Sequence, residues 1–266
     1  MERVALAAVL FLIGGLVASG VLVVILNFEH MPIDPASPIQ YTYQIIKTHP
    51  HDPTAFTEGL VFDNGVLYES TGEYGSSSLR QVNLENGDVQ RKVLLLNQYF
   101  GEGLTVVNDS IVQLTWKEAI GFIYDKETFG LLGNFSYSSE GWGLTFNGNE
   151  LIMSDGTSKL TFLDPISFLI VGQISVHDGN TPVANINELE FINGAVYANI
   201  WMQQKIAIID PQTGTVKGWI DLTGIYQSSN IEDVLNGIAY DSQTNRLLIT
   251  GKDWPNLYEI TIIPTK

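Results

Sequence analysis

The sequence of 266 residues contains no cysteine, which excludes disulfides, thiol nucleophiles, zinc–thiolate sites and iron–sulfur clusters. Basic residues are also scarce, because 13 Lys and Arg stand against 29 Asp and Glu and the formal net charge is −16. A surface of that sign repels phosphates, so we expect no nucleic-acid partner for the body of the chain. Charged residues make up only 16% and hydrophobic residues 45%, which indicates a globular protein rather than a disordered acidic tail.

One long uncharged run is present, at residues 4–26, and it is long enough for a membrane-crossing helix of about 20 residues. A cleaved signal peptide is the alternative, with a small-residue site at Ala18, but the apolar run continues well beyond that site. We predict a transmembrane anchor at residues 1–27 and a proline-rich spacer at 28–40. We expect the domain at 41–266 outside the cytoplasm, or secreted if the first segment is cleaved.

A repeat organises residues 41–266, with similar segments beginning at Glu58, Glu102, Trp142, Asn187 and Asn236. Each has a polar or aromatic residue, a small or acidic residue, a short strand, an Asn/Asp/Gly turn and a second strand. A period of about 40–50 residues with paired strands is typical of propeller blades of about four strands. The sequence therefore predicts an all-β fold, a five-bladed β-propeller, with a sandwich as the structural alternative.

The last repeat has room for three strands but hardly for four. We expect residues 41–47, YTYQIIK, to supply its missing outer strand. Pairing strands from both ends of the domain would close the ring and remove exposed edges.

The repeat also predicts where a site lies, because the start of each inner strand and the end of the next strand meet on one face. Glu58, Glu102, Trp142, Asn187 and Asn236 stand at the strand starts. Trp116, Trp201 and Lys252 stand at the ends of the returning strands. Each has a structural alternative: a tryptophan can wedge two blades together, Asn236 can satisfy backbone groups, and Lys252 can balance a glutamate charge.

Three histidines, His49, His51 and His177, show no pairing at metal-ligand spacing and no serine–histidine–aspartate arrangement. We expect them on the surface or in loops.

Ordered blocks between residues 43 and 262 resemble the plant and bacterial type of glutaminyl-peptide cyclotransferase. The blocks are FTEGL at 56–60, YESTG at 68–72, YFGEGLT at 99–105, GWGL at 141–144, SDGT at 154–157, NELE at 187–190, ANIW at 198–201, VLNGIA at 234–239 and TGKDWP at 250–255. The fold of that family is a five-bladed propeller, as the spacing already predicts.

The resemblance implies cyclisation of an N-terminal glutaminyl residue to pyroglutamate with release of ammonia. The substrate's own amine is the nucleophile, so the resemblance implies no metal and no cofactor. It implies that Glu102 transfers the proton, that Asn187 orients the substrate, and that Lys252 is the lysine of the channel. The implied apolar walls are Phe56, Phe100, Trp116, Trp142 and Trp201. The partners expected are N-terminal glutaminyl peptides, bound by a monomer.

The sequence departs from the family at Glu58, where a glutamine is usual. Either Glu58 and Glu102 share a proton or Lys252 compensates one charge, and our hypothesis is that Glu58 holds the substrate's α-ammonium. Two other functions stay open: a non-catalytic propeller that binds peptide or sugar through the tryptophan-lined mouth, and a metal-dependent hydrolase such as a lactonase.

Overall fold

The structure, a computed structural model, describes residues 37–265, and every regular element in this range is a β-strand. The all-β prediction is therefore confirmed. Between residues 37 and 265 no helix has the length and apolar character to cross a membrane. The predicted anchor at 1–27, with its uncharged run 4–26, lies outside the described residues, as does most of the predicted spacer 28–40.

Three sheets each contain four strands that pair in the order in which they follow along the chain. The first sheet comprises β2 (Thr57–Asp63), β3 (Val66–Thr71), β4 (Ser78–Val82) and β5 (Val89–Leu94). The second comprises β6 (Gly101–Val107), β7 (Ser110–Thr115), β8 (Ile120–Asp125) and β9 (Leu131–Ser136). The third comprises β10 (Leu144–Phe146), β11 (Leu151–Ser154), β12 (Lys159–Leu163) and β13 (Ile170–Ser175).

An eight-stranded sheet contains the remaining long strands as two such units placed side by side. One unit comprises β16 (Ile186–Ile192), β17 (Ala195–Ile200), β18 (Lys205–Ile209) and β19 (Val216–Asp221). The other comprises β20 (Leu235–Asp241), β21 (Arg246–Gly251), β22 (Asn256–Pro264) and β1 (Ile39–Pro50). A small separate ribbon is formed by β14 (His177–Asp178) and β15 (Thr181–Pro182).

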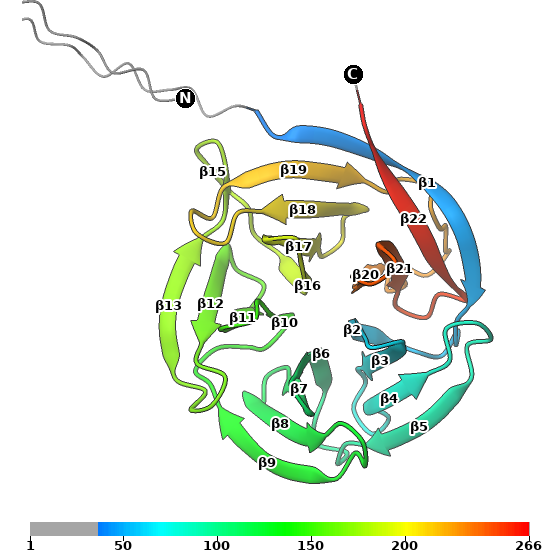
Figure 1. The fold of residues 1–266 in the computed structure, drawn as a ribbon, viewed down its shortest axis with the longest axis vertical. Helices are drawn as coiled ribbons and strands as arrows, with labels where there is room; N and C mark the ends of the chain where they lie inside the picture. Colours follow the sequence, from blue (N-terminus) through cyan, green and yellow to red (C-terminus); the bar gives the residue numbers. More distant parts are fainter. Residues whose placement is uncertain (1–36, 266) are drawn as a thin grey trace, which may run out of the picture. The chain divides into compact units, whose positions relative to one another are not determined.

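These units stand around a common centre, with β2, β6, β10, β16 and β20 innermost (Figure 1). Burial follows that order, because β2 and β6 are almost wholly buried while the outer strands β5 and β9 are largely exposed. Their sequences match this difference: β2 reads TEGLVFD, whereas β5 reads VQRKVL and carries two cations. The first strand of each unit is thus placed to line a central site.

Tight turns connect the inner hairpins. Asn64 and Gly65 link β2 to β3, and Asn193 and Gly194 link β16 to β17, all four with positive φ. Two consecutive left-handed residues are what a two-residue hairpin turn requires, and Asn-Gly supplies them at least cost. The turn residues seen in the sequence therefore fix the register of these inner hairpins.

The two ends of the described chain meet in one unit. Strand β1 pairs antiparallel with β22, from Tyr41 opposite Pro264 to Pro50 opposite Asn256. The outer strand predicted at 41–47 is confirmed, and it extends from Ile39 to Pro50. The first residues of β1 also pair in parallel with β19, which joins two units into the eight-stranded sheet.

The core lies between neighbouring units. One cluster contains Leu60 and Leu67 of the first unit packed with Ala239, Leu248 and Leu257 of the last. Each fully buried leucine stabilises the fold by about 1.5–3 kcal/mol relative to an exposed one. This cluster therefore holds the first unit against the unit that contains the C-terminal strands.

Candidate active site

A cavity of about 490 Å³ lies where the inner strands begin. Its lining residues are Phe56, Glu58, Glu73, Phe100, Glu102, Trp116, Trp142, Asn187, Trp201, Met202, Ile231, Glu232, Val234 and Lys252. All the predicted catalytic and substrate-binding residues line this cavity, whereas Asn236, which was also predicted at a strand start, does not. The repeat register thus brings together side chains that lie far apart along the chain.

The strand register explains how the polar members reach the cavity. Glu58, Glu102 and Asn187 are each the second residue of an inner strand, β2, β6 and β16. Pairing with the next strand is interrupted at each of these positions, as at a β-bulge. A bulge turns a side chain out of the regular alternation, so the local irregularity aims these residues at the centre.

Glu58 and Lys252 form a buried ion pair. The Lys252 Nζ lies 2.6 Å from Glu58 Oε1, and the Asn236 amide donates to Glu58 Oε2 at 3.0 Å. Lys252 follows β21 directly, and its ammonium also lies 4.4 Å from the centre of the Phe56 ring. Both Glu58 oxygens are therefore engaged by the protein, and this arrangement does not favour a role in holding the substrate's ammonium.

Glu102 is buried differently. Only 5% of it is exposed, and its Oε2 has no hydrogen-bond partner among residues 37–265. Burial, and next the charge of Glu58, raise its pKa well above the usual range, while Lys252 partly offsets them. Burial also raises the pKa of Glu58, and there Lys252 acts against it. Of the two acids, Glu102 is the one with an oxygen free for a bound molecule.

Aromatic rings form the walls. Phe100 packs against both Phe56, at 6.1 Å between ring centres, and Trp116, at 5.5 Å. Trp142 packs edge-on against Trp201 at 5.7 Å. Apolar walls disfavour the charged form of an acid beside them, which agrees with the raised pKa of Glu102.

Glu140 holds two of the wall residues in place, although no pattern in the sequence singled it out. Its Oε2 accepts hydrogen bonds from the indole N–H of Trp116 at 2.7 Å and of Trp142 at 2.9 Å. The two indoles come from different units, so one carboxylate sets the spacing between them.

Glycines at the ends of other returning strands make room for these rings. A Cβ on Gly72 would lie 2.3 Å from the Phe100 ring, and one on Gly156 would lie 2.6 Å from the Trp142 ring. Real Cβ contacts are never so close. Gly72 and Gly156 therefore leave the space that the Phe100 and Trp142 rings occupy.

The two amides behave differently. Asn236 donates to Glu58 and, at 2.9 Å, to the backbone oxygen of Thr57, so it joins β20 to β2. Asn187 is 3% exposed, and its Oδ1 finds no partner within the described part of the chain. Asn187 is thus the amide available to a bound molecule.

The remaining lining residues were missed by the sequence analysis. Ile231, Glu232 and Val234 lie on the segment between β19 and β20, within the longest spacing of the repeat. That extra length was the signal for a loop reaching the cavity. Glu73 and Met202 directly follow two of the predicted strand returns.

The prediction for the histidines is wrong for His49, whereas His51 lies in a loop as expected but is buried there. His49 is 1% exposed on β1, and His51 is 6% exposed in the segment that follows. His51 contacts Glu69, which explains its burial because a buried polar ring needs partners. Across residues 37–265, no group of three or more His, Asp or Glu residues is placed to hold a metal ion.

An all-β ring of sheets around a cavity with a buried acid, an ion pair and aromatic walls defines an enzyme-like site for a small polar group. The chain belongs to the glutamine cyclotransferase family, whose model matches residues 17–262. It is 42% identical over 226 residues to a glutaminyl-peptide cyclotransferase of Arabidopsis thaliana, covering 82% of this chain and 71% of the relative. A crystal structure of glutaminyl cyclase from Myxococcus xanthus superposes with a TM-score of 0.81 at 40% identity, covering 86% of this chain and all of that one.

Proposed function

We propose that this protein is a glutaminyl-peptide cyclotransferase in which Glu102 carries the proton between the two substrate nitrogens. The observation that carries the mechanism is the buried Glu102 carboxyl, which lines the cavity and whose Oε2 has no hydrogen-bond partner among the described residues. Membership of the glutamine cyclotransferase family supports the overall reaction.

The chemistry needs one acid–base group. The substrate's α-amine attacks its γ-carboxamide carbon, a ring C–N bond forms, and the bond to the amide nitrogen breaks. Glu102 takes a proton from the amine and gives one to the departing nitrogen, which leaves as ammonia. A carboxyl whose pKa is raised well above its usual range by burial suits both steps.

The other residues bind and orient. Asn187 hydrogen-bonds the substrate amide. The Lys252 ammonium stabilises the negative charge that develops on the carboxamide oxygen. The aromatic walls favour the folded-back conformation in which the amine lies near the carboxamide, and ring closure benefits strongly from such proximity. The substrate class is peptides or proteins with N-terminal glutamine.

Ammonia release from a glutaminyl dipeptide tests this proposal. We expect release by the wild-type protein and a loss of kcat of about 100- to 10,000-fold in Glu102→Gln, the usual range for a lost acid–base group. Glu127→Gln, on the exposed turn after β8, is the control and keeps wild-type activity. Binding of the dipeptide without ammonia release across a wide pH range would favour the binding-module alternative.

We also infer that the four-stranded units are five propeller blades and that 41–266 form one catalytic domain closed by the N-terminal strand. The meander order of each unit and the placement of units around one centre support this (Figure 1). We also propose that the enzyme acts as a monomer.

Residues 4–26 are proposed to anchor the enzyme in a membrane with the domain on the extracytoplasmic side. The support is the uncharged apolar run alone. Full-length protein should then remain in the membrane fraction after alkaline washing, and its domain should be cleaved by protease added from outside. Recovery of a mature chain lacking these residues would instead indicate a signal peptide.

A further inference from the structure

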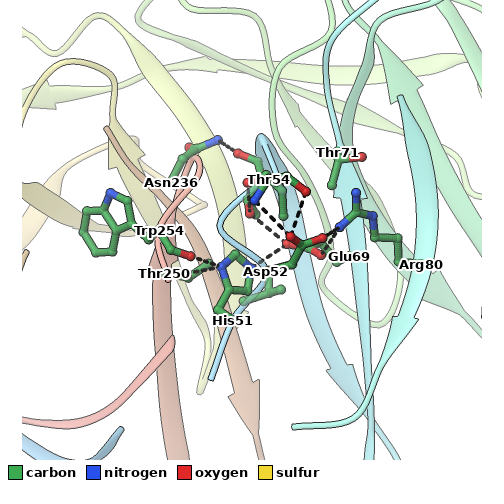
Figure 2. A network of polar contacts seen from close by, with 12 residues as sticks. His51, Asp52, Thr54, Glu69, Thr71, Arg80, Asn236, Thr250 and Trp254 are labelled. Carbon is green, nitrogen blue, oxygen red and sulfur yellow. Dashed lines mark hydrogen bonds and ion pairs between the residues drawn. The ribbon is translucent and has the colours of Figure 1, made fainter. Parts of the chain in front are cut away.

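A buried polar network lies beside the cavity, between β3, β4 and the segment that precedes β2 (Figure 2). At its centre His51 Nε2 lies 2.8 Å from Glu69 Oε1. The other ring nitrogen, Nδ1, lies 2.5 Å from the backbone oxygen of Trp254. Glu69 is 1% exposed, and no residue of this group was assigned a part in the reaction.

The network ties together the two segments that carry the Glu58–Lys252 pair. Thr57, which directly precedes Glu58, donates its hydroxyl to Glu69 Oε1 at 2.8 Å. Trp254 lies two residues after Lys252 on the segment between β21 and β22. His51 and Glu69 therefore stand between the start of β2 and the segment that carries Lys252.

The partners of His51 decide its protonation. A backbone oxygen and a carboxylate both accept hydrogen bonds and cannot donate, so each ring nitrogen must carry a proton. Thr250 agrees with this, because its hydroxyl donates to the Asn256 oxygen at 3.0 Å and only its lone pair faces His51 Nδ1 at 3.4 Å. An imidazole with both nitrogens protonated is the cation.

The surrounding charges are consistent with a buried cation. Glu69 faces His51 from β3, Asp52 follows it in sequence, and Asp253 approaches from the segment after β21. Arg80 of β4 lies 2.8 Å from Asp52 and 3.8 Å from Glu69, which keeps both carboxyls ionised. Although burial lowers the pKa of His51, the Glu69 charge and hydrogen bond outweigh it and raise the pKa above 6.5.

We propose that His51 and Glu69 form a proton-dependent clamp, with His51 a positioning residue that holds Lys252 and Glu58 in register across the cavity. The inference rests on the proposed function, because the relative position of Lys252 and Glu58 is measured through its effect on catalysis. When His51 loses its proton, one ring nitrogen faces an acceptor with a lone pair, so the tie to Trp254 or to Glu69 is lost. The Lys252 segment is then held less firmly beside the start of β2, where the backbone bonds from Asp253 to Ala55, at 2.8 Å, and from His51 to Pro255, at 3.0 Å, remain.

Two measurements on the full-length protein test the clamp. In protein labelled with ¹⁵N-histidine, we expect both His51 nitrogens to be protonated at pH 7 and to titrate above pH 6.5. We expect His51→Gln to lower kcat by about 10- to 100-fold, the cost of a misplaced reacting group, with a smaller change in KM. Wild-type kcat should fall at the pH where the His51 nitrogens titrate, and this step should be absent from the variant.

His49→Gln is the matched control, because His49 is also buried, two residues earlier, and its ion-pair partner is Glu259 of β22, at 3.8 Å, rather than Glu69. It should keep the wild-type kcat and pH profile. The clamp is overturned if His51 has one unprotonated nitrogen at pH 7, or if folded His51→Gln keeps wild-type kcat and its alkaline step. If His51→Gln does not fold, the ¹⁵N titration of wild-type protein decides. A wild-type protein that releases no ammonia overturns the proposed function instead, while the nitrogen signals still report on the clamp.

Discussion

At the residue scale, the unusual feature is a second buried acid beside the proposed proton carrier. Glu58 raises the pKa of Glu102 by its charge, and Lys252 lowers it. The Lys252 Nζ donates a hydrogen bond to Glu58 Oε1 at 2.6 Å, so the lysine charge is partly neutralised by Glu58. The protonation of Glu102 thus depends on a balance between two partners.

Replacing Glu58 by glutamine should shift that balance in one direction. Glu58→Gln removes a nearby negative charge and leaves the Lys252 charge free to act on Glu102, so the pKa of Glu102 falls. We expect the step in the kcat–pH profile that belongs to Glu102 to move to lower pH, with turnover at neutral pH kept or raised. The kcat–pH profiles of the wild-type protein and of Glu58→Gln, measured with a glutaminyl dipeptide, test this prediction. A shift of the Glu102 step to higher pH would contradict it.

The sequence predicted the cavity residues well because strand starts and returns repeat at a fixed register. Glu102 and Trp201 could be placed on one face from that register alone. Glu140 and the His51–Glu69 pair could not, because their partners depend on side chains meeting across units. His51 and Trp254 are 203 positions apart, and no local pattern encodes such a contact.

At the element scale, glycine governs how closely the inner strands approach. The third residue is glycine in β2, β6 and β20, and Gly143 directly precedes β10. A Cβ on Gly143 would lie 2.1 Å from the backbone oxygen of Asn187 and 2.9 Å from the Cα of Glu188. Because these neighbours are backbone atoms, the inner strands themselves would have to move.

Gly143→Ala should therefore destabilise the protein by about 3 kcal/mol, the upper part of the usual range for overpacking. Displacement of Asn187 should also lower kcat/KM for a glutaminyl dipeptide. Gly172→Ala on the outer strand β13 is the control, because its Cβ would meet nothing closer than 3.8 Å. Urea unfolding should show wild-type stability for Gly172→Ala within about 1 kcal/mol, and equal midpoints for both variants would contradict the packing argument.

At the scale of the whole molecule, the inner strand β16 has an acid, Glu188, where β2, β6 and β20 have glycine, and a second acid, Glu190, two residues later. Glu188 of β16 accepts backbone hydrogen bonds from Leu60 of β2, at 3.2 Å, and Ile238 of β20, at 2.8 Å. Glu190 accepts one from Tyr240 at 3.0 Å. These carboxyls link three units at the centre, and burial raises the pKa of both, with the neighbouring Glu190 adding to the shift of Glu188.

These buried acids predict how stability depends on pH. Burial raises the pKa of Glu190 from 4.5 to about 8, so between these values the folded protein binds more protons than the unfolded chain. The free energy of unfolding then falls as pH rises, by about 1.4 kcal/mol per pH unit for each such group. Repulsion from the net charge of −16 acts in the same direction.

Below about pH 4 the free energy of unfolding falls as pH falls. Carboxyls such as Asp241 have pKa values lowered by hydrogen bonds, including those from Arg246, and the stabilisation that they supply is lost as they are protonated. Stability should therefore be greatest near pH 5 and fall toward pH 8, as measured by urea unfolding. Glu190→Gln keeps a carbonyl acceptor for Tyr240 and cannot ionise, so its curve should be flatter above pH 5, whereas the exposed control Glu127→Gln should follow the wild type. A wild-type stability that rises from pH 5 to pH 8 would show that these central acids are ionised at little cost.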